Sequence, residues 1–85
     1  MKEIAIEKII EILNSNIKEN EIKIEQTNEN LSNLGMDSIS FIQIIVALEE
    51  TFDCEIPDSK LLITEMDTAQ KMFDVLQELY NTQPL

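Results

Sequence analysis

The sequence predicts an all-α fold, a four-helix bundle with a long first loop and a short third helix. Apolar residues recur at three- and four-residue steps in several segments, as they do on one face of an α-helix. Glycine occurs once and proline twice. A fold of many strands needs more of these turn-forming residues. A chain of 85 residues has room for one domain, so we expect a single domain over 1–85.

The first helix is expected over residues 2–17, where isoleucine and leucine follow the helical period. Its stripe is Ile6, Ile9, Ile10, Leu13 and Ile17. Between residues 18 and 37 the period fails and asparagine is frequent. A packed loop is expected there, with room for one short helical turn. The apolar residues that would hold this loop on the core are Ile22, Ile24, Leu31 and Leu34.

Three further helices are expected after the loop. One covers residues 38–52, because Asp37 or Ser38 can cap its first N–H groups. A shorter one covers 59–64, and the last covers 68–80. The apolar stripe of the last helix is Met72, Phe73, Leu76 and Leu79. The tail beyond it is expected to fray.

The chain is strongly acidic, with 17 acidic residues against six basic ones and a net charge of −11. Such a chain repels phosphate backbones and anionic lipid headgroups, so neither nucleic acid nor a membrane surface is an expected partner. Proteins with basic patches are expected partners, because opposite charge steers association. The acidity is also compatible with a simpler interpretation, in which it keeps a small domain soluble.

The residue types argue against an enzyme and against a metal centre. Histidine is absent, which removes the commonest general base, and Cys54 has no second cysteine for a disulfide or a zinc cluster. An acidic metal-binding protein is a further alternative, but Asp53, Glu55 and Asp58 lack the spacing and the glycine of a calcium loop. Divalent ions are therefore expected only to relieve repulsion among the carboxylates. No cleavage-site pattern and no long apolar run is visible, so a cytoplasmic protein is expected.

The helix expected over 38–52 carries two apolar stripes, of which the larger would pack on the core. The larger stripe is Phe41, Ile44, Ile45, Leu48 and Phe52. The smaller one, rotated to a different side, is Ile39, Ile42 and Val46, and it ends beside Glu49 and Glu50. A helix that is apolar on two sides is either centrally buried or keeps one side for a partner. We interpret the smaller stripe as an interaction surface, since carboxylates border it.

Ser38 stands where the long loop meets this helix, in the segment LGMDSI over residues 34–39. The simple interpretation of Ser38 is a helix cap. With no histidine to activate its hydroxyl, Ser38 is not expected to act as a nucleophile for this chain's own catalysis. A hydroxyl placed after Gly35, however, is accessible to another enzyme. A phosphate attached there would lie near the positive end of the helix dipole.

The chain resembles the acyl carrier proteins, a family that includes the peptidyl carrier domains of nonribosomal synthetases. The resemblance rests on LGMDSI over residues 34–39, VALEETFD over 46–53 and EIPD over 55–58, and it extends over nearly the whole chain. It implies a four-helix bundle of the acyl carrier type. It also implies a carrier, not an enzyme, that holds acyl or aminoacyl groups as thioesters on a 4′-phosphopantetheine arm attached to Ser38.

The resemblance further implies a set of partners. A separate Mg²⁺-dependent phosphopantetheinyl transferase would attach the arm from coenzyme A, and Asp37 corresponds to the acidic residue that helps the transferase and its metal engage. The other expected partners are acyl- or aminoacyl-loading and condensing enzymes with basic docking surfaces. The carrier itself is expected to be a monomer. The residues that correspond to the recognition helix and its approach are Met36, Ile39, Ile42, Val46, Glu49 and Glu50.

Two departures bear on the pathway. Ser40 and Gln43 stand where fatty-acid carriers often have acidic residues, and the stretch over 59–67 is longer and more apolar than their third helix. We therefore favour a discrete carrier for nonribosomal peptide, polyketide or specialised acyl biosynthesis. The housekeeping carrier of fatty-acid synthesis is the alternative within the family. An unmodified helical protein-interaction module is the alternative of another class.

Overall fold

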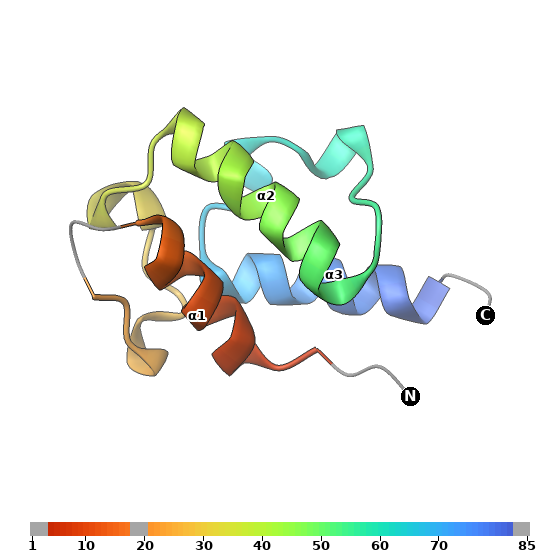
Figure 1. The fold of residues 1–85 in the computed structure, drawn as a ribbon, viewed down its shortest axis with the longest axis horizontal. Coiled ribbons are helices and arrows are strands. Elements are labelled where there is room, and N and C mark those ends of the chain that lie inside the picture. The colour runs from red at the N-terminus through yellow and green to blue at the C-terminus, as the bar shows by residue number, and fades with distance from the viewer. Residues whose placement is uncertain (1–3, 18–20, 83–85) are drawn as a thin grey trace.

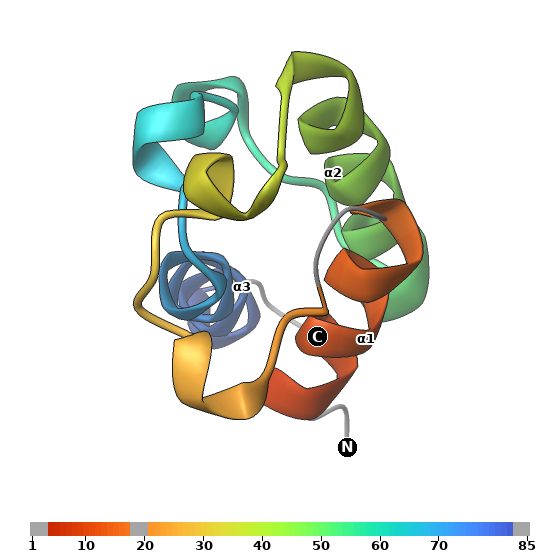
Figure 2. The ribbon, with the colours of Figure 1, turned by 90° about the vertical axis from the view of Figure 1, so that its left-hand side faces the viewer.

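The computed structural model describes residues 4–17 and 21–82. Within these ranges the fold is all-α, with three α-helices and no strand: α1 (Ile6–Asn16), α2 (Ser38–Phe52) and α3 (Ala69–Thr82). Helix α1 packs against both α2 and α3 (Figure 1). Viewed from one end, the three helices and the long connections surround a common interior (Figure 2). The predicted all-α class is therefore confirmed for the described residues.

The segment between α2 and α3 differs from the predicted third helix over 59–64. It forms two single turns of 3₁₀-helix, η3 (Asp58–Lys60) and η4 (Ile63–Glu65), and neither has a side-chain cap. The three consecutive apolar residues over 61–63 cannot all lie on one face of an α-helix. Separate short turns instead bury Met66 while Leu62 stays 57% exposed. A bundle of four α-helices is thus not confirmed.

Helix α1 is shorter at its start than predicted. Residues 1–3 lie outside the described ranges, Ile4 precedes the helix, and Ala5 is an N-cap without a side chain that can accept a hydrogen bond. At the other end, Asn14 forms two hydrogen bonds with the backbone of Ile22. Its Nδ2 donates to the carbonyl at 3.0 Å and its Oδ1 accepts from the N–H at 2.7 Å. This pair of bonds fixes the returning chain against α1.

The long loop contains two turns of 3₁₀-helix, η1 (Ile24–Gln26) and η2 (Leu31–Leu34). Two backbone hydrogen bonds, each of 2.8 Å, attach it to the start of α3: Leu31 N–H donates to the Asp67 carbonyl, and Gln70 N–H donates to the Thr27 carbonyl. The loop also contributes Ile22, Leu31 and Leu34 to the core, as predicted. Ile24 was expected there too, but it is 46% exposed.

The core stripe predicted for α2 is confirmed, since all five of its members are buried. They are Phe41, Ile44, Ile45, Leu48 and Phe52. Helix α3 starts after Thr68, whose Oγ1 accepts from the Lys71 N–H at 3.0 Å and so acts as the cap. The helix continues to Thr82, two residues beyond the predicted end. Near that end, the Tyr80 hydroxyl donates to the Phe52 carbonyl and joins α3 to α2.

Candidate functional site

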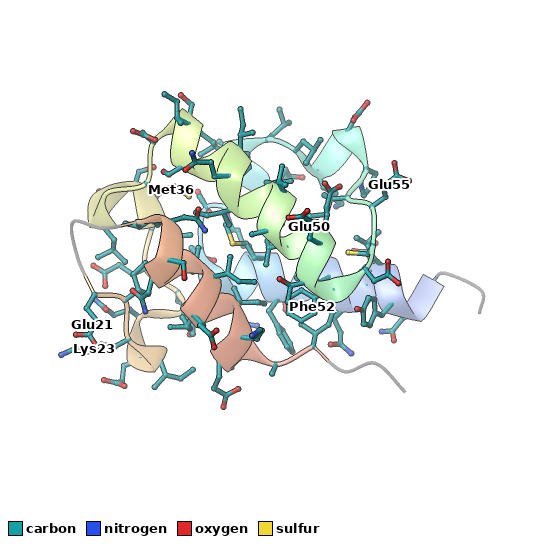
Figure 3. The ribbon with its side chains drawn as sticks, viewed as in Figure 1. Glu21, Lys23, Met36, Glu50, Phe52 and Glu55 are labelled. Atoms are coloured by element: carbon teal, nitrogen blue, oxygen red, sulfur yellow. The ribbon has the colours of Figure 1, made fainter. Side chains whose placement is uncertain are left out.

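The approach to α2 depends on Gly35, the C-cap of η2. Its φ of 109° and ψ of 2° lie in a region that residues with a Cβ atom avoid. This conformation lets the Met36 N–H donate back to the Leu31 carbonyl at 2.9 Å, which closes the turn. Met36 itself is only 5% exposed, and it is labelled in Figure 3 beside the start of α2. Its side chain belongs to the core, whereas the resemblance implied that it is a partner-binding residue.

Asp37 and Ser40 cap α2 by bonding to each other. Asp37 Oδ1 accepts from the Ser40 N–H at 2.8 Å, and Ser40 Oγ accepts from the Asp37 N–H at 2.9 Å. These two bonds form a capping box, in which each residue satisfies a backbone donor of the other. Hydrogen bonds from Ser40, first its backbone N–H and then its hydroxyl, lower the pKa of the Asp37 carboxyl below its ordinary value. Of the two predicted caps, Asp37 is therefore the one used.

Ser38 is left free of the capping role. It is the first residue of α2 and is exposed, and within the described part of the chain its hydroxyl makes no hydrogen bond. The start of this 15-residue helix also favours negative charge. Its first backbone N–H groups have no partner within the helix, and the positive end of the helix dipole lies there. An exposed hydroxyl at this place therefore fits a covalently attached phosphate ester.

The smaller apolar stripe of α2 lies on the surface beside Ser38. Ile39 is 69% exposed, Ile42 62% and Val46 47%. These three residues are called the outer stripe below. The first eleven residues of α2 carry no charge, so the outer stripe is uncharged until the helix reaches its two glutamates. The outer stripe is therefore an exposed apolar strip of β-branched side chains on α2.

The two glutamates at the end of α2 have different surroundings. Glu49 is half-buried, and its Oε2 accepts from the Ile56 N–H at 2.9 Å. Glu50 is exposed and is labelled in Figure 3 on the outward side of α2, with Glu55 on the connection that follows. Sequence reasoning placed both glutamates on one partner surface. It missed the bond of Glu49, because no local pattern reports a contact seven residues away.

The stretch of sequence that contains α2 is acidic. From residue 24 to residue 59 the chain has eight carboxylates and neither lysine nor arginine: Glu25, Glu29, Asp37, Glu49, Glu50, Asp53, Glu55 and Asp58. Over the described ranges, no three histidine, cysteine or carboxylate residues are grouped so that they could hold a metal ion. None of the helices in that part of the chain has both the length and the hydropathy to cross a membrane.

Fold and site together define a small helical protein with an exposed serine at the start of α2. A family model described as a phosphopantetheine attachment site matches residues 7–76, from the first turn of α1 to the middle of α3. The chain belongs to this family. It is a carrier protein for acyl or peptidyl groups, and its cofactor is covalently bound 4′-phosphopantetheine. Carrier domains of this family are not catalytic, and they interact with phosphopantetheinyl transferases and acyl-handling enzymes.

Proposed function

We propose that Ser38 is the residue that receives 4′-phosphopantetheine. The observation that carries this proposal is the division of roles at the start of α2, where Asp37 and Ser40 form the cap and leave the Ser38 hydroxyl exposed. Two of the other serines are less suited. Ser40 is buried in the capping box, and the Ser15 hydroxyl donates to the Glu11 carbonyl within α1.

The modification is a phosphoryl transfer to the Ser38 hydroxyl. Ser38 Oγ forms a bond to the pantetheine-side phosphorus of coenzyme A, the pyrophosphate P–O bond breaks, and adenosine 3′,5′-diphosphate leaves with the bonding electrons. The hydroxyl proton passes to a base of the transferase. Once attached, the group supplies a terminal thiol that holds cargo as a thioester.

Asp37 is proposed to engage the transferase and its Mg²⁺. Its pKa is lowered, so the carboxylate is ionised at neutral pH. It directly precedes Ser38, and only one of its oxygens, Oδ1, is used in the capping bond with Ser40. A carboxylate in this position can contribute negative charge toward a metal ion held by the transferase, because hard cations prefer oxygen ligands.

The partner surface is proposed to consist of the outer stripe with Glu50 at its end. The apolar part supplies contact area and the acidic surroundings steer enzymes with basic docking surfaces, which are the loading and condensing enzymes of the pathway. Met36 is not included, because it is buried, and Glu49 is not included, because its carboxylate is bonded to Ile56. Docking of this kind lets a flexible arm present cargo at high effective concentration.

For the pathway, we propose a cytoplasmic and monomeric carrier in nonribosomal peptide, polyketide or specialised acyl biosynthesis. The residues at two positions where fatty-acid carriers often have acidic side chains support this proposal. Ser40 forms part of the cap of α2, and Gln43 is exposed and uncharged. A panel of purified enzymes separates the alternatives. Loading by an adenylating enzyme but not by a malonyl transferase agrees with the proposal, and the reverse result identifies a housekeeping fatty-acid carrier.

The attachment residue is tested by intact mass spectrometry. The protein is incubated with coenzyme A, Mg²⁺ and a permissive phosphopantetheinyl transferase, beside Ser38→Ala and the matched control Ser59→Ala, which changes another exposed serine. We expect the wild type and Ser59→Ala to gain one phosphopantetheine and Ser38→Ala to gain none. A gain in Ser38→Ala would place the attachment elsewhere. No gain in the wild type, with a transferase active on another carrier, would favour the unmodified interaction module, to which the exposed outer stripe is equally suited.

A further inference from the structure

Asp67 is an acidic residue that the proposed function does not use, and it lies between η4 and the start of α3. Its side chain is only 17% exposed. Its Oδ1 atom has almost no exposed surface, and apart from the Lys71 ammonium, 2.9 Å away, it has no polar partner among the described residues. Lys71 is therefore the residue that balances this charge, because a buried carboxylate oxygen without a partner costs stability.

Lys71 stands at a position that helix electrostatics do not favour. It is the third residue of α3, and the positive end of a helix dipole disfavours a cation there. The same ammonium also donates to the Thr64 carbonyl in η4, at 3.2 Å. The contacts of Lys71 with Asp67 and Thr64 offset the unfavourable position, and they join η4 to the start of α3.

Asp67 is also the residue to which the long loop is attached. Its backbone carbonyl accepts from the Leu31 N–H at 2.8 Å, and the Leu31 carbonyl accepts from the Met36 N–H at 2.9 Å. Met36 is buried and stands two residues before Ser38. Figure 2 shows η2, in yellow, between the segment that precedes α3 and the start of α2. A continuous series of contacts thus leads from the ammonium on α3 to the segment that enters α2.

We propose that Lys71 is a positioning residue for the modification of Ser38. Its charge holds Asp67, Asp67 anchors the long loop, and the loop sets the path of the chain into the attachment site. The inference deepens the proposed function and rests on it for the reaction. Because Lys71 acts through Asp67, it influences the placement of the Ser38 hydroxyl and not the docking of the carrier, which is proposed to depend on the outer stripe.

The test is the steady-state kinetics of phosphopantetheine transfer to the Lys71→Met variant, in which the side chain stays unbranched but the ammonium is removed. We expect kcat to fall by about threefold or more with little change in KM, because a small misplacement of the acceptor hydroxyl slows the transfer step. Hydrogen exchange of the Leu31 amide, followed by NMR, should be faster than in the wild type. Lys71→Arg, which restores a cation, should recover both properties. Asp67→Asn combined with Lys71→Met should recover part of kcat, because it removes the unbalanced charge.

Lys8→Met is the matched control, because it removes the ammonium of an exposed ion pair, Lys8–Glu11, within α1. It should leave kcat and the exchange of Leu31 unchanged. In Lys71→Met, a raised KM with unchanged kcat would mean that part of the carrier is unfolded or that Lys71 contacts the transferase, and either result overturns the inference. Wild-type kcat in Lys71→Met overturns it as well, and leaves the proposed function intact. If a transferase active on another carrier does not modify the wild type, the proposed function itself fails.

Discussion

Asp37 and Ser40 hold each other through reciprocal hydrogen bonds of 2.8 and 2.9 Å between the side chain of each and the backbone N–H of the other. Ser38 lies between them in sequence and takes no part in these bonds. Ser38, the proposed attachment residue, thus lies between two residues whose side chains form the cap of α2. Substitution of Asp37 or Ser40 therefore tests the cap, and substitution of Ser38 tests the proposed attachment site.

Asp37→Asn tests whether the charge of Asp37 contributes to stability through the cap. Asparagine also caps helices well but does not titrate. The folded-state pKa of Asp37 lies below its ordinary value of 3.8, so its ionised form stabilises the fold above that value. This contribution is lost as pH falls through the lower folded value. Thermal melts should show the wild type losing its advantage over Asp37→Asn only in that acidic window. A constant difference at all pH values would contradict the assignment.

Gly35→Ala should destabilise the protein by about 1–2 kcal/mol, since a Cβ atom is disfavoured in the left-handed region. It should also slow modification of Ser38, because the turn at Gly35 sets the path into α2. Denaturant unfolding and modification kinetics measure the two effects. Gly35→Asn is the comparison, because asparagine tolerates this region better. Equal stability of Gly35→Ala and the wild type would show that the turn relaxes elsewhere.

Ile42→Gln should leave stability within about 0.5 kcal/mol of the wild type, because Ile42 is 62% exposed. We expect KM for the transferase and for loading enzymes to rise, with little change in kcat, if the outer stripe is the docking surface. Ile44→Gln, two residues away and fully buried, should cost about 2–5 kcal/mol and serves as the contrast. An unchanged KM for every partner would exclude the outer stripe as the contact.

Tyr80→Phe should cost about 1 kcal/mol, because it removes the hydrogen bond that the Tyr80 hydroxyl donates to the Phe52 carbonyl. Urea unfolding of the two proteins measures this difference. The exposed residue Gln77 lies on the same helix, and Gln77→Ala should change stability by less than about 0.5 kcal/mol. If both substitutions have equally small effects, the bond between the ends of α2 and α3 contributes nothing to stability.

Divalent cations should raise the melting temperature modestly by relieving repulsion among the carboxylates of a chain with a net charge of −11. Sodium chloride at matched ionic strength should reproduce much of the effect, because screening does not require a specific site. Melting curves in Mg²⁺, Ca²⁺ and NaCl make the comparison. A stoichiometric, tight calcium site in calorimetry would revive the metal-binding alternative.

The sequence predicts best where the determinants are local. The range of α2 follows from a cap at its start and an apolar period along it, and the exposure of Ile39 and Ile42 follows from the same period. The segment over 59–64 is less predictable, because consecutive apolar residues suit several short conformations and the surrounding core selects between them. Local propensity is a weak guide where tertiary contacts decide.

At the candidate site, too, features with local determinants are predictable from the sequence and features that depend on tertiary contacts are not. Ser38 and Asp37 are proposed as site residues from a short segment, and the spacing of Asp37 to Ser40 is the one signal that was available for the capping box. The burial of Met36 and the bond between Glu49 and Ile56 depend on how the chain returns to α2. Such contacts leave no periodic trace in the sequence.

The two backbone bonds that join the long loop to the start of α3 have a consequence for protein synthesis. Leu31 is bonded to Asp67, and Thr27 to Gln70, so the loop that leads to Ser38 is completed by residues made much later. A nascent chain that has not yet released residue 70 from the ribosome lacks these anchors. The conformation of the loop that leads to Ser38 therefore depends on residues that follow Leu31 and Thr27 by 36 and 43 positions.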